Sequence, residues 1–178
     1  MPFDRARTAR GALAGAIAAG TWSAQSPLDM RAFGVAYSDE ALLGKAFTRG
    51  PAWPVVGVGL HLLFGASFGA AYANVAPRLP LPSWARGPAV ALVEHLATWP
   101  MTAATDRVHP ARDDMPLLWG SSRAFAQATW RHLVFGVVLG ELERRFNGST
   151  DARVPSYEHV VSSNGHGDLE HAVGASES

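Results

Sequence analysis

His-Leu-Leu-Phe-Gly-Ala-Ser-Phe-Gly is the sequence of residues 61–69, and residues 132–140 repeat it as His-Leu-Val-Phe-Gly-Val-Val-Leu-Gly. On a helix, positions i, i+4 and i+8 lie along one face. Each copy therefore predicts a helix whose packing face carries a histidine and two notches without side chains. These residues are His61, Gly65 and Gly69 in the first copy and His132, Gly136 and Gly140 in the second. Such small-residue spacing is typical of close helix packing in membranes.

The duplication extends beyond this motif. Both halves carry the same landmarks in the same order, namely Ala-Arg-Gly (residues 9–11 and 85–87), Thr-Trp (21–22 and 98–99), an aspartate (Asp29 and Asp106) and the histidine helix. Ordered landmarks over such a distance favour duplication of one two-helix unit over chance similarity. We therefore expect residues 9–76 and 85–146 to form an internal repeat.

Composition favours a membrane protein. The chain has 178 residues, of which 48% are hydrophobic and only 17% charged, and its formal net charge is zero. The length is that of one domain, and so little charge is unusual for a soluble protein. The absence of cysteine excludes disulfides, thiolate metal sites, iron–sulfur clusters and thiol catalysis. No basic stripe with interleaved aromatic residues points to nucleic acid.

Four apolar stretches approach or exceed the roughly 20 residues that cross a hydrocarbon core. They lie at about 11–28, 52–76, 87–105 and 124–142. The first could also be a signal peptide, but the bulky Trp22 near its end and its place in the repeat favour a retained span. The predicted fold class is all-α, a four-transmembrane-helix bundle built from two parallel-repeat helix pairs.

Local signals define the shorter elements. Ser38 is a suitable N-cap for a short interfacial helix over residues 39–49, and Pro100 is expected to kink or stop the third span. Residues 147–178 are polar and lack a periodic apolar pattern, which predicts a disordered tail. The membrane domain would then comprise residues 1–146.

Ionisable groups within spans are costly in lipid and are expected to face the bundle interior and pair. We predict an ion pair between Glu94 and Arg131, which should lie at similar depths. The expected intramembrane polar network comprises Glu94, His95, Gln127, Arg131, His132 and His61. Its simplest role is a structural lock between the two halves, and a proton or ion relay is the alternative.

Asp29 and Asp106 lie at the outer ends of the first and third spans, each close in sequence to an arginine. We expect solvated surface pairs there, with a cation site as the alternative. Lysine and arginine are more frequent near span ends on the side of the two termini, which predicts cytoplasmic termini. Sequence motifs for metal proteases, phosphate-binding loops, dinucleotide sites and nucleophiles are absent, so an enzyme is disfavoured and no metal site is expected.

Several stretches resemble a known group of proteins. They are Ala-Arg-Gly at 9–11, Asp-Glu-Ala-Leu-Leu-Gly-Lys at 39–45, the His61 helix, and Arg-Ala-Phe-Ala-Gln-Ala-Thr-Trp-Arg-His at 123–132. Over about residues 5–147 the chain resembles uncharacterised small four-helix integral membrane proteins of high-GC, actinobacterial-type bacteria. The resemblance implies location in the bacterial cytoplasmic membrane and the helix count, and it carries no activity.

Two functional hypotheses follow. The first is a non-enzymatic polytopic inner-membrane protein, either an assembly or interaction partner or a minor permeation element. Its partners would be the lipid bilayer and a second copy or another membrane protein. The second is a b-type haem electron-transfer protein, with His61 and His132 as axial ligands and the glycine notches admitting the porphyrin. A soluble helical bundle is a third possibility.

Overall fold

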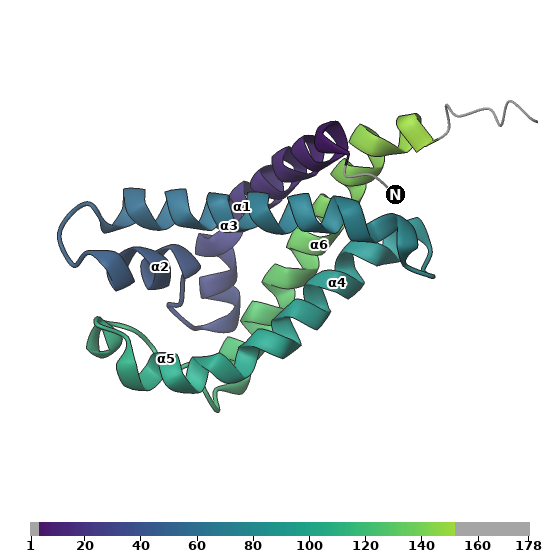
Figure 1. The fold of residues 1–178 in the computed structure, drawn as a ribbon. Coiled ribbons are helices and arrows are strands. Elements are labelled where there is room, and N and C mark those ends of the chain that lie inside the picture. Colours follow the sequence, from purple (N-terminus) through teal and green to yellow (C-terminus); the bar gives the residue numbers. More distant parts are fainter. Residues whose placement is uncertain (1–3, 152–178) are drawn as a thin grey trace, which may run out of the picture. The chain divides into compact units, whose positions relative to one another are not determined.

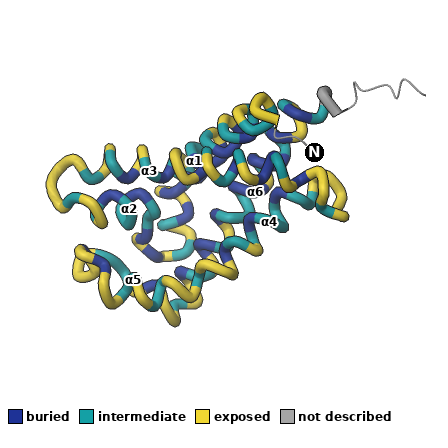
Figure 2. The backbone as a smooth tube through the Cα atoms, viewed as in Figure 1, coloured by how far each residue is buried: buried dark blue, intermediate teal, exposed yellow. Residues whose placement is uncertain are grey.

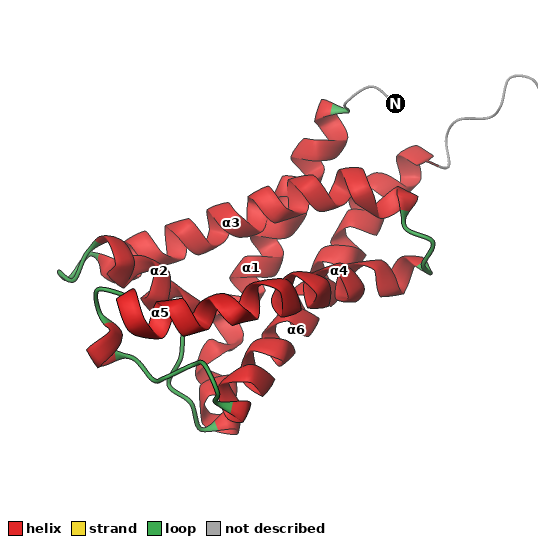
Figure 3. Ribbon diagram, turned by 60° about the horizontal axis from the view of Figure 1, so that its bottom comes forward, coloured by secondary structure: helices red, strands yellow, loops and turns green. Residues whose placement is uncertain are grey.

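The computed structural model describes residues 4–151, with side chains described for residues 4–148. Within that range the chain forms helices and no strand (Figure 3). The α-helices are α1 (Arg5–Phe33), α2 (Asp39–Phe47), α3 (Trp53–Val75), α4 (Ser83–Thr98), α5 (Thr102–Val108) and α6 (Ser122–Asp151) (Figure 1). Short 3-10 helices lie at Ala76–Arg78, Trp99–Met101 and Arg112–Asp114. The predicted all-α fold is confirmed.

The helix ends follow from local sequence signals. Asp4 caps α1 by accepting hydrogen bonds from the backbone N–H groups of the first turn, and α1 ends at Gly34, whose left-handed φ of 66° favours glycine. The predicted N-cap is confirmed, because the Ser38 side chain accepts from the backbone N–H of Ala41. The predicted stop at Pro100 is also confirmed, since α4 ends at Thr98 and a 3-10 helix follows.

The α1–α3 pair crosses at glycines. Gly11 and Gly15 of α1 lie against Gly65 and Gly69 of α3, and a Cβ added at Gly15 would overlap the carbonyl oxygen of Gly65. The two backbones can approach this closely only because neither side carries side chains there. The glycines of the first repeated motif therefore form a helix-crossing surface.

The α4–α6 pair crosses in the same way. Gly87 of α4 lies against Gly136 and Gly140 of α6, and a Cβ added at Gly87 would overlap the carbonyl oxygen of Gly136. Gly87 is the last residue of the second Ala-Arg-Gly landmark, as Gly11 is of the first. In the first pair Gly15 meets both Gly65 and Gly69 and Gly11 meets Gly69, whereas in the second pair Gly87 meets both Gly136 and Gly140.

The distribution of side chains is unusual for a water-soluble fold. Of the five largest fully buried side chains, Arg131, His95, Gln127 and Asn147 are polar and Leu139 is apolar. The buried apolar residues are mostly alanines, whereas large apolar side chains are exposed on α1, α3, α4 and α6. Figure 2 shows exposed positions along the outer faces of these helices. The interior is thus rich in small and polar groups, and the outside is rich in large apolar ones.

One described helical segment, Trp53–Arg78, is long and apolar enough to cross a membrane. The sequence prediction of four such helices is therefore supported only in part. The helix α4 has 16 residues because the Trp-Pro pair ends it early. The apolar stretches of α1 and α6 are diluted by small and polar residues, which lowers their hydropathy.

The predicted boundary at residue 146 lies one residue before the end of the compact unit. The compact unit ends at Asn147, and α6 continues to Asp151. Asn147 is fully buried, accepts a hydrogen bond from Nε of Arg10 at 2.7 Å and donates to Glu143 at 3.2 Å. A polar side chain whose hydrogen bonds are satisfied can remain in a buried helix, which composition does not reveal. Residues 152–178 lie outside the described part of the chain.

Candidate functional site

Arg131 of α6 lies at the centre of a buried polar network. Its guanidinium donates two hydrogen bonds to Asp29 of α1, at 2.7 Å from Nε and 2.5 Å from Nη2. It also donates to Asp39 at 3.2 Å and to the backbone oxygen of Tyr37 at 2.9 Å. Arg131 and Asp29 are both almost completely buried. The bidentate geometry makes this a strong and directional ion pair, which ties α6 to α1 and to the start of α2.

Two sequence predictions are wrong here. Arg131 does not pair with Glu94, because its guanidinium is held by the carboxylates of Asp29 and Asp39. Asp29 is not solvated at a surface, since it is only 3% exposed. Asp106, its counterpart in the repeat, instead accepts from the backbone N–H groups of Leu118 and Trp119. The two aspartates therefore hold different partners and do not converge on a cation.

Further groups complete the Arg131 network. The fully buried Gln127 donates to Asp29 at 2.7 Å and to the backbone oxygen of Val35 at 3.2 Å. The Tyr37 hydroxyl donates to Asp39 at 2.5 Å. Burial raises the pKa of Tyr37 well above its usual value, and the Asp39 carboxylate adds to the shift. The phenol therefore keeps the proton that this hydrogen bond needs.

Glu94 of α4 pairs with His132 of α6, at 2.9 Å between Oε2 and Nε2. The other ring nitrogen of His132 lies 2.7 Å from the carbonyl oxygen of Ala128, which can only accept, so Nδ1 carries a proton. A second proton must lie between Nε2 and the carboxylate for that contact to be a hydrogen bond. The pair is therefore either a histidinium beside a carboxylate or a neutral histidine beside a carboxylic acid.

The remaining two histidines have different surroundings. His95 lies 3.0 Å from the hydroxyl of Thr129 and packs on His132, with ring centroids 4.5 Å apart. His61 packs edge-on against Trp22, and its Nε2 is buried without a hydrogen-bond partner. Trp22 also contacts His132, at 4.7 Å between ring centroids, and donates from its indole to Asp39 at 3.0 Å.

The structure thus brings the predicted network residues into two clusters. Arg131 and Gln127 meet through Asp29, while Glu94, His95 and His132 form the second cluster. Trp22 lies against both, through Asp39 on one side and the rings of His61 and His132 on the other. Sequence reasoning missed Asp29, Asp39, Tyr37 and Trp22 as network members. Trp22 and Asp29 did appear as landmarks of the repeat, which was the available signal.

An open cavity of about 480 Å³ adjoins these clusters. Residues from α1, α2, α3, α4 and α6 line it, so it lies between the two glycine-crossed helix pairs. Its polar lining includes Asp39, His61, Glu94, His95 and His132. Aromatic rings supply much of the rest, from Trp22, Tyr37, Phe64, Phe68, Trp99 and Phe135. This is the candidate binding site.

In this arrangement His132 offers no free ring nitrogen for axial ligation of haem b. An axial ligand needs a ring nitrogen free to donate electrons to iron. Nε2 of His132 is engaged by Glu94 and its Nδ1 by Ala128, and Trp22 contacts both His61 and His132. Among the described residues, no group of three or more histidine or acidic side chains is placed to hold a metal ion.

Comparisons of the chain with protein-family models, with curated proteins and with solved structures found no match. The function is therefore inferred from the residues and their geometry.

Proposed function

We propose that this chain is a non-enzymatic polytopic protein of the bacterial cytoplasmic membrane, in which α1, α3, the α4–α5 segment and α6 cross the bilayer. It acts as an assembly or interaction partner, for a second copy or another membrane protein, or as a minor permeation element. The observation that carries the proposal is the inverted side-chain distribution. Arg131, Gln127 and His95 are buried, whereas large apolar side chains such as Leu63 and Val137 are exposed.

Water and lipid make opposite demands on such a surface. In water, exposure of many large apolar side chains forfeits about 25 cal/mol for each Å² left unburied. In lipid those side chains are solvated, and polar groups must turn inward and pair. Helix contact in lipid then depends on small residues and interhelical hydrogen bonds. The glycine crossings and the Arg131–Asp29 pair supply both, which supports a fold adapted to the bilayer.

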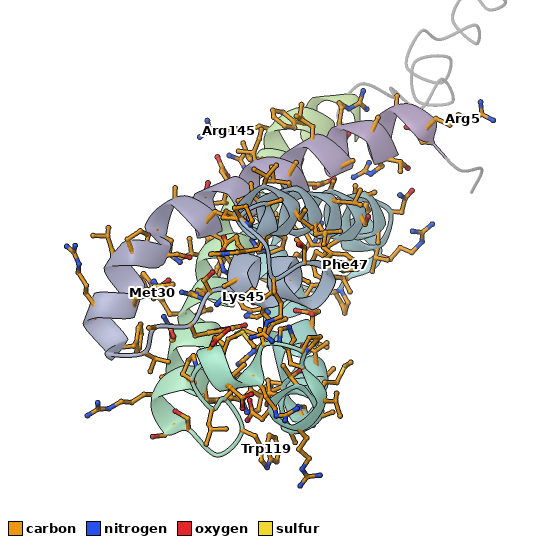
Figure 4. The ribbon with its side chains drawn as sticks, turned by 90° about the vertical axis from the view of Figure 1, so that its left-hand side faces the viewer. Arg5, Met30, Lys45, Phe47, Trp119 and Arg145 are labelled. Carbon is orange, nitrogen blue, oxygen red and sulfur yellow. The ribbon has the colours of Figure 1, made fainter. Side chains whose placement is uncertain are left out.

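The matching glycine crossings of α1–α3 and α4–α6 support duplication of a two-helix unit with both pairs in the same orientation. The beginning and end of the compact unit also lie together, since Arg7 of α1 bonds Glu143 of α6 at 2.8 Å. Figure 4 shows Arg5 and Arg145 toward one end and Trp119 at the other. The positive-inside bias then favours a cytoplasmic location for the end that carries the termini.

Within this proposal, the Arg131 network is a structural lock. It joins α6, from the second half, to α1 and α2, from the first, across the centre of the bundle. A buried ion pair of this kind adds specificity of arrangement rather than much net stability. A fixed interior leaves the apolar outer faces as the surfaces for lipid and for a partner protein.

Cysteine labelling tests the membrane location. The chain contains no cysteine, so single-cysteine variants have no background. Val137→Cys lies on an exposed apolar position of α6, and Asp113→Cys and Arg145→Cys lie at exposed polar positions of opposite ends. A membrane-impermeant maleimide should label Asp113→Cys in intact cells, Arg145→Cys only after cell disruption, and Val137→Cys only after denaturation.

Labelling of Val137→Cys in washed membranes at the rate of Asp113→Cys would contradict burial of α6 in lipid, as would recovery of the protein in the soluble fraction. Labelling of Arg145→Cys in intact cells would instead reverse the proposed orientation and leave the membrane location standing.

A further inference from the structure

We propose that the central cavity binds a lipophilic aromatic cation bearing N–H groups, with the Glu94 carboxylate facing its positive charge. This inference goes beyond the proposed membrane function. It concerns what the cavity recognises, and it is tested on protein in detergent, so it can fail while the membrane location stands.

The acidic residues of the lining favour a cation over an anion. The acidic residues that line the cavity are Asp39 and Glu94, and neither lysine nor arginine lines it. Asp39 is already engaged by Arg131, Tyr37 and Trp22. Glu94 has a side chain that is 38% exposed, and its ion-pair partner is His132. Glu94 is therefore the carboxylate that an incoming cation can reach.

The aromatic rings select an organic cation over a metal ion. The aromatic side chains that line the cavity include Trp22, Phe64, Phe68, Trp99 and Phe135. Aromatic rings attract weakly hydrated cations through the ring quadrupole and bury apolar groups, whereas they offer no oxygen ligands to a hydrated metal ion. The cavity volume of about 480 Å³ falls within the range of small-molecule sites.

The opening admits a ligand with an apolar body. Phe64 of α3 and Thr98 of α4 both line the cavity and are exposed, which places its opening between these two helices. The same two helices expose further apolar side chains, including Leu63 and Leu96. A lipophilic molecule can therefore approach from an apolar surface, as from the lipid side of the proposed bundle.

His61 supplies a second, independent sign of a ligand. It is only 9% exposed and lines the cavity, and its Nε2 has no hydrogen-bond partner in the protein. Buried polar atoms are almost always paired, because an unpaired one costs about 1–3 kcal/mol. Because this nitrogen is covered by protein, the His61 ring would turn toward the cavity to pair it with an N–H group of a bound cation, while the ligand's ring lies against the aromatic walls.

Ethidium is a suitable probe, because it is a planar aromatic cation with amino groups and its fluorescence rises in an apolar site. Purified protein in detergent should bind it saturably at one site, above the signal of empty micelles. Glu94→Gln should weaken binding by about tenfold or more, since it removes the charge with little change of shape. The matched control is Glu141→Gln, which removes an exposed carboxylate of α6 outside the cavity and should leave the affinity within about twofold.

Dihydroethidium, kept reduced, has the same skeleton without the charge and should bind about tenfold more weakly or worse. If Glu94→Gln does not fold, Phe64→Leu at the exposed opening tests the aromatic wall and should weaken ethidium binding severalfold. Absence of saturable ethidium binding to the folded protein would overturn the proposal. Equal affinity for the neutral compound, or unchanged affinity after loss of the Glu94 charge, would do so as well.

Discussion

Replacement of Asp29 by alanine isolates the central ion pair. The substitution removes both hydrogen bonds from Arg131 to Asp29, at 2.7 and 2.5 Å, and the acceptor of the Gln127 amide at 2.7 Å. Arg131 remains fully buried and keeps only a 3.2 Å contact with Asp39 and a bond to a backbone oxygen. A buried guanidinium would thus lose its closest counter-charge.

The expected loss of stability follows from these contacts. A hydrogen bond to a charged group contributes about 1.5–3 kcal/mol, and removal of one partner of a buried ion pair costs about 3–5 kcal/mol. Because Asp39 still contacts the Arg131 guanidinium, we expect a loss of stability near the lower end of the range for a buried ion pair, about 3 kcal/mol. For a chain of this length, that lowers the unfolding midpoint by about 10 °C.

The assay is thermal unfolding of purified protein in detergent, followed by circular dichroism. Asp113→Ala is the control, because it removes an exposed carboxylate and should change stability by less than about 0.5 kcal/mol. Arg131→Met should be destabilising alone, and its combination with Asp29→Ala should cost less than the sum, since the two residues share one interaction. An Asp29→Ala midpoint equal to that of Asp113→Ala, or full additivity in the double variant, would refute the buried pair.

Two further outcomes follow from the fold. Gly15→Ala should destabilise the protein by about 2–3 kcal/mol, because the added Cβ meets the backbone of α3. Gly20→Ala on the same helix is the control: its Cβ makes only an ordinary side-chain contact, and the change should be neutral or stabilising by up to about 1 kcal/mol. Equal unfolding midpoints of the two variants in thermal melts would contradict the glycine crossing. The second outcome concerns the partner of Glu94. His132→Asn removes the ring nitrogen that lies 2.9 Å from Oε2 of Glu94 and should strengthen ethidium binding severalfold, because Glu94 loses this competing contact. Unchanged or weaker binding by this variant would contradict competition between His132 and the ligand for Glu94.

Local signals were sufficient for much of the helical framework. The Ser38 cap, the Pro100 stop and the helices around the two histidine motifs depend on interactions within a few residues, so the sequence shows them directly. The end of α6 was predicted too early, because the burial of Asn147 depends on Arg10 at the other end of the unit. Local composition carries no information about such a distant partner.

The sequence by itself determined the all-α class, the approximate bounds of α2 and α3, the duplicated landmarks and the need for buried polar groups to pair. Only the tertiary structure decided which groups pair. Arg131 meets Asp29 rather than Glu94, and Glu94 meets His132. The physical reason is that helical periodicity gives each residue's face and depth, whereas partners depend on how the helices cross and rotate against one another. Here, the glycine crossings determine that packing, and the cavity forms between the two helix pairs they create.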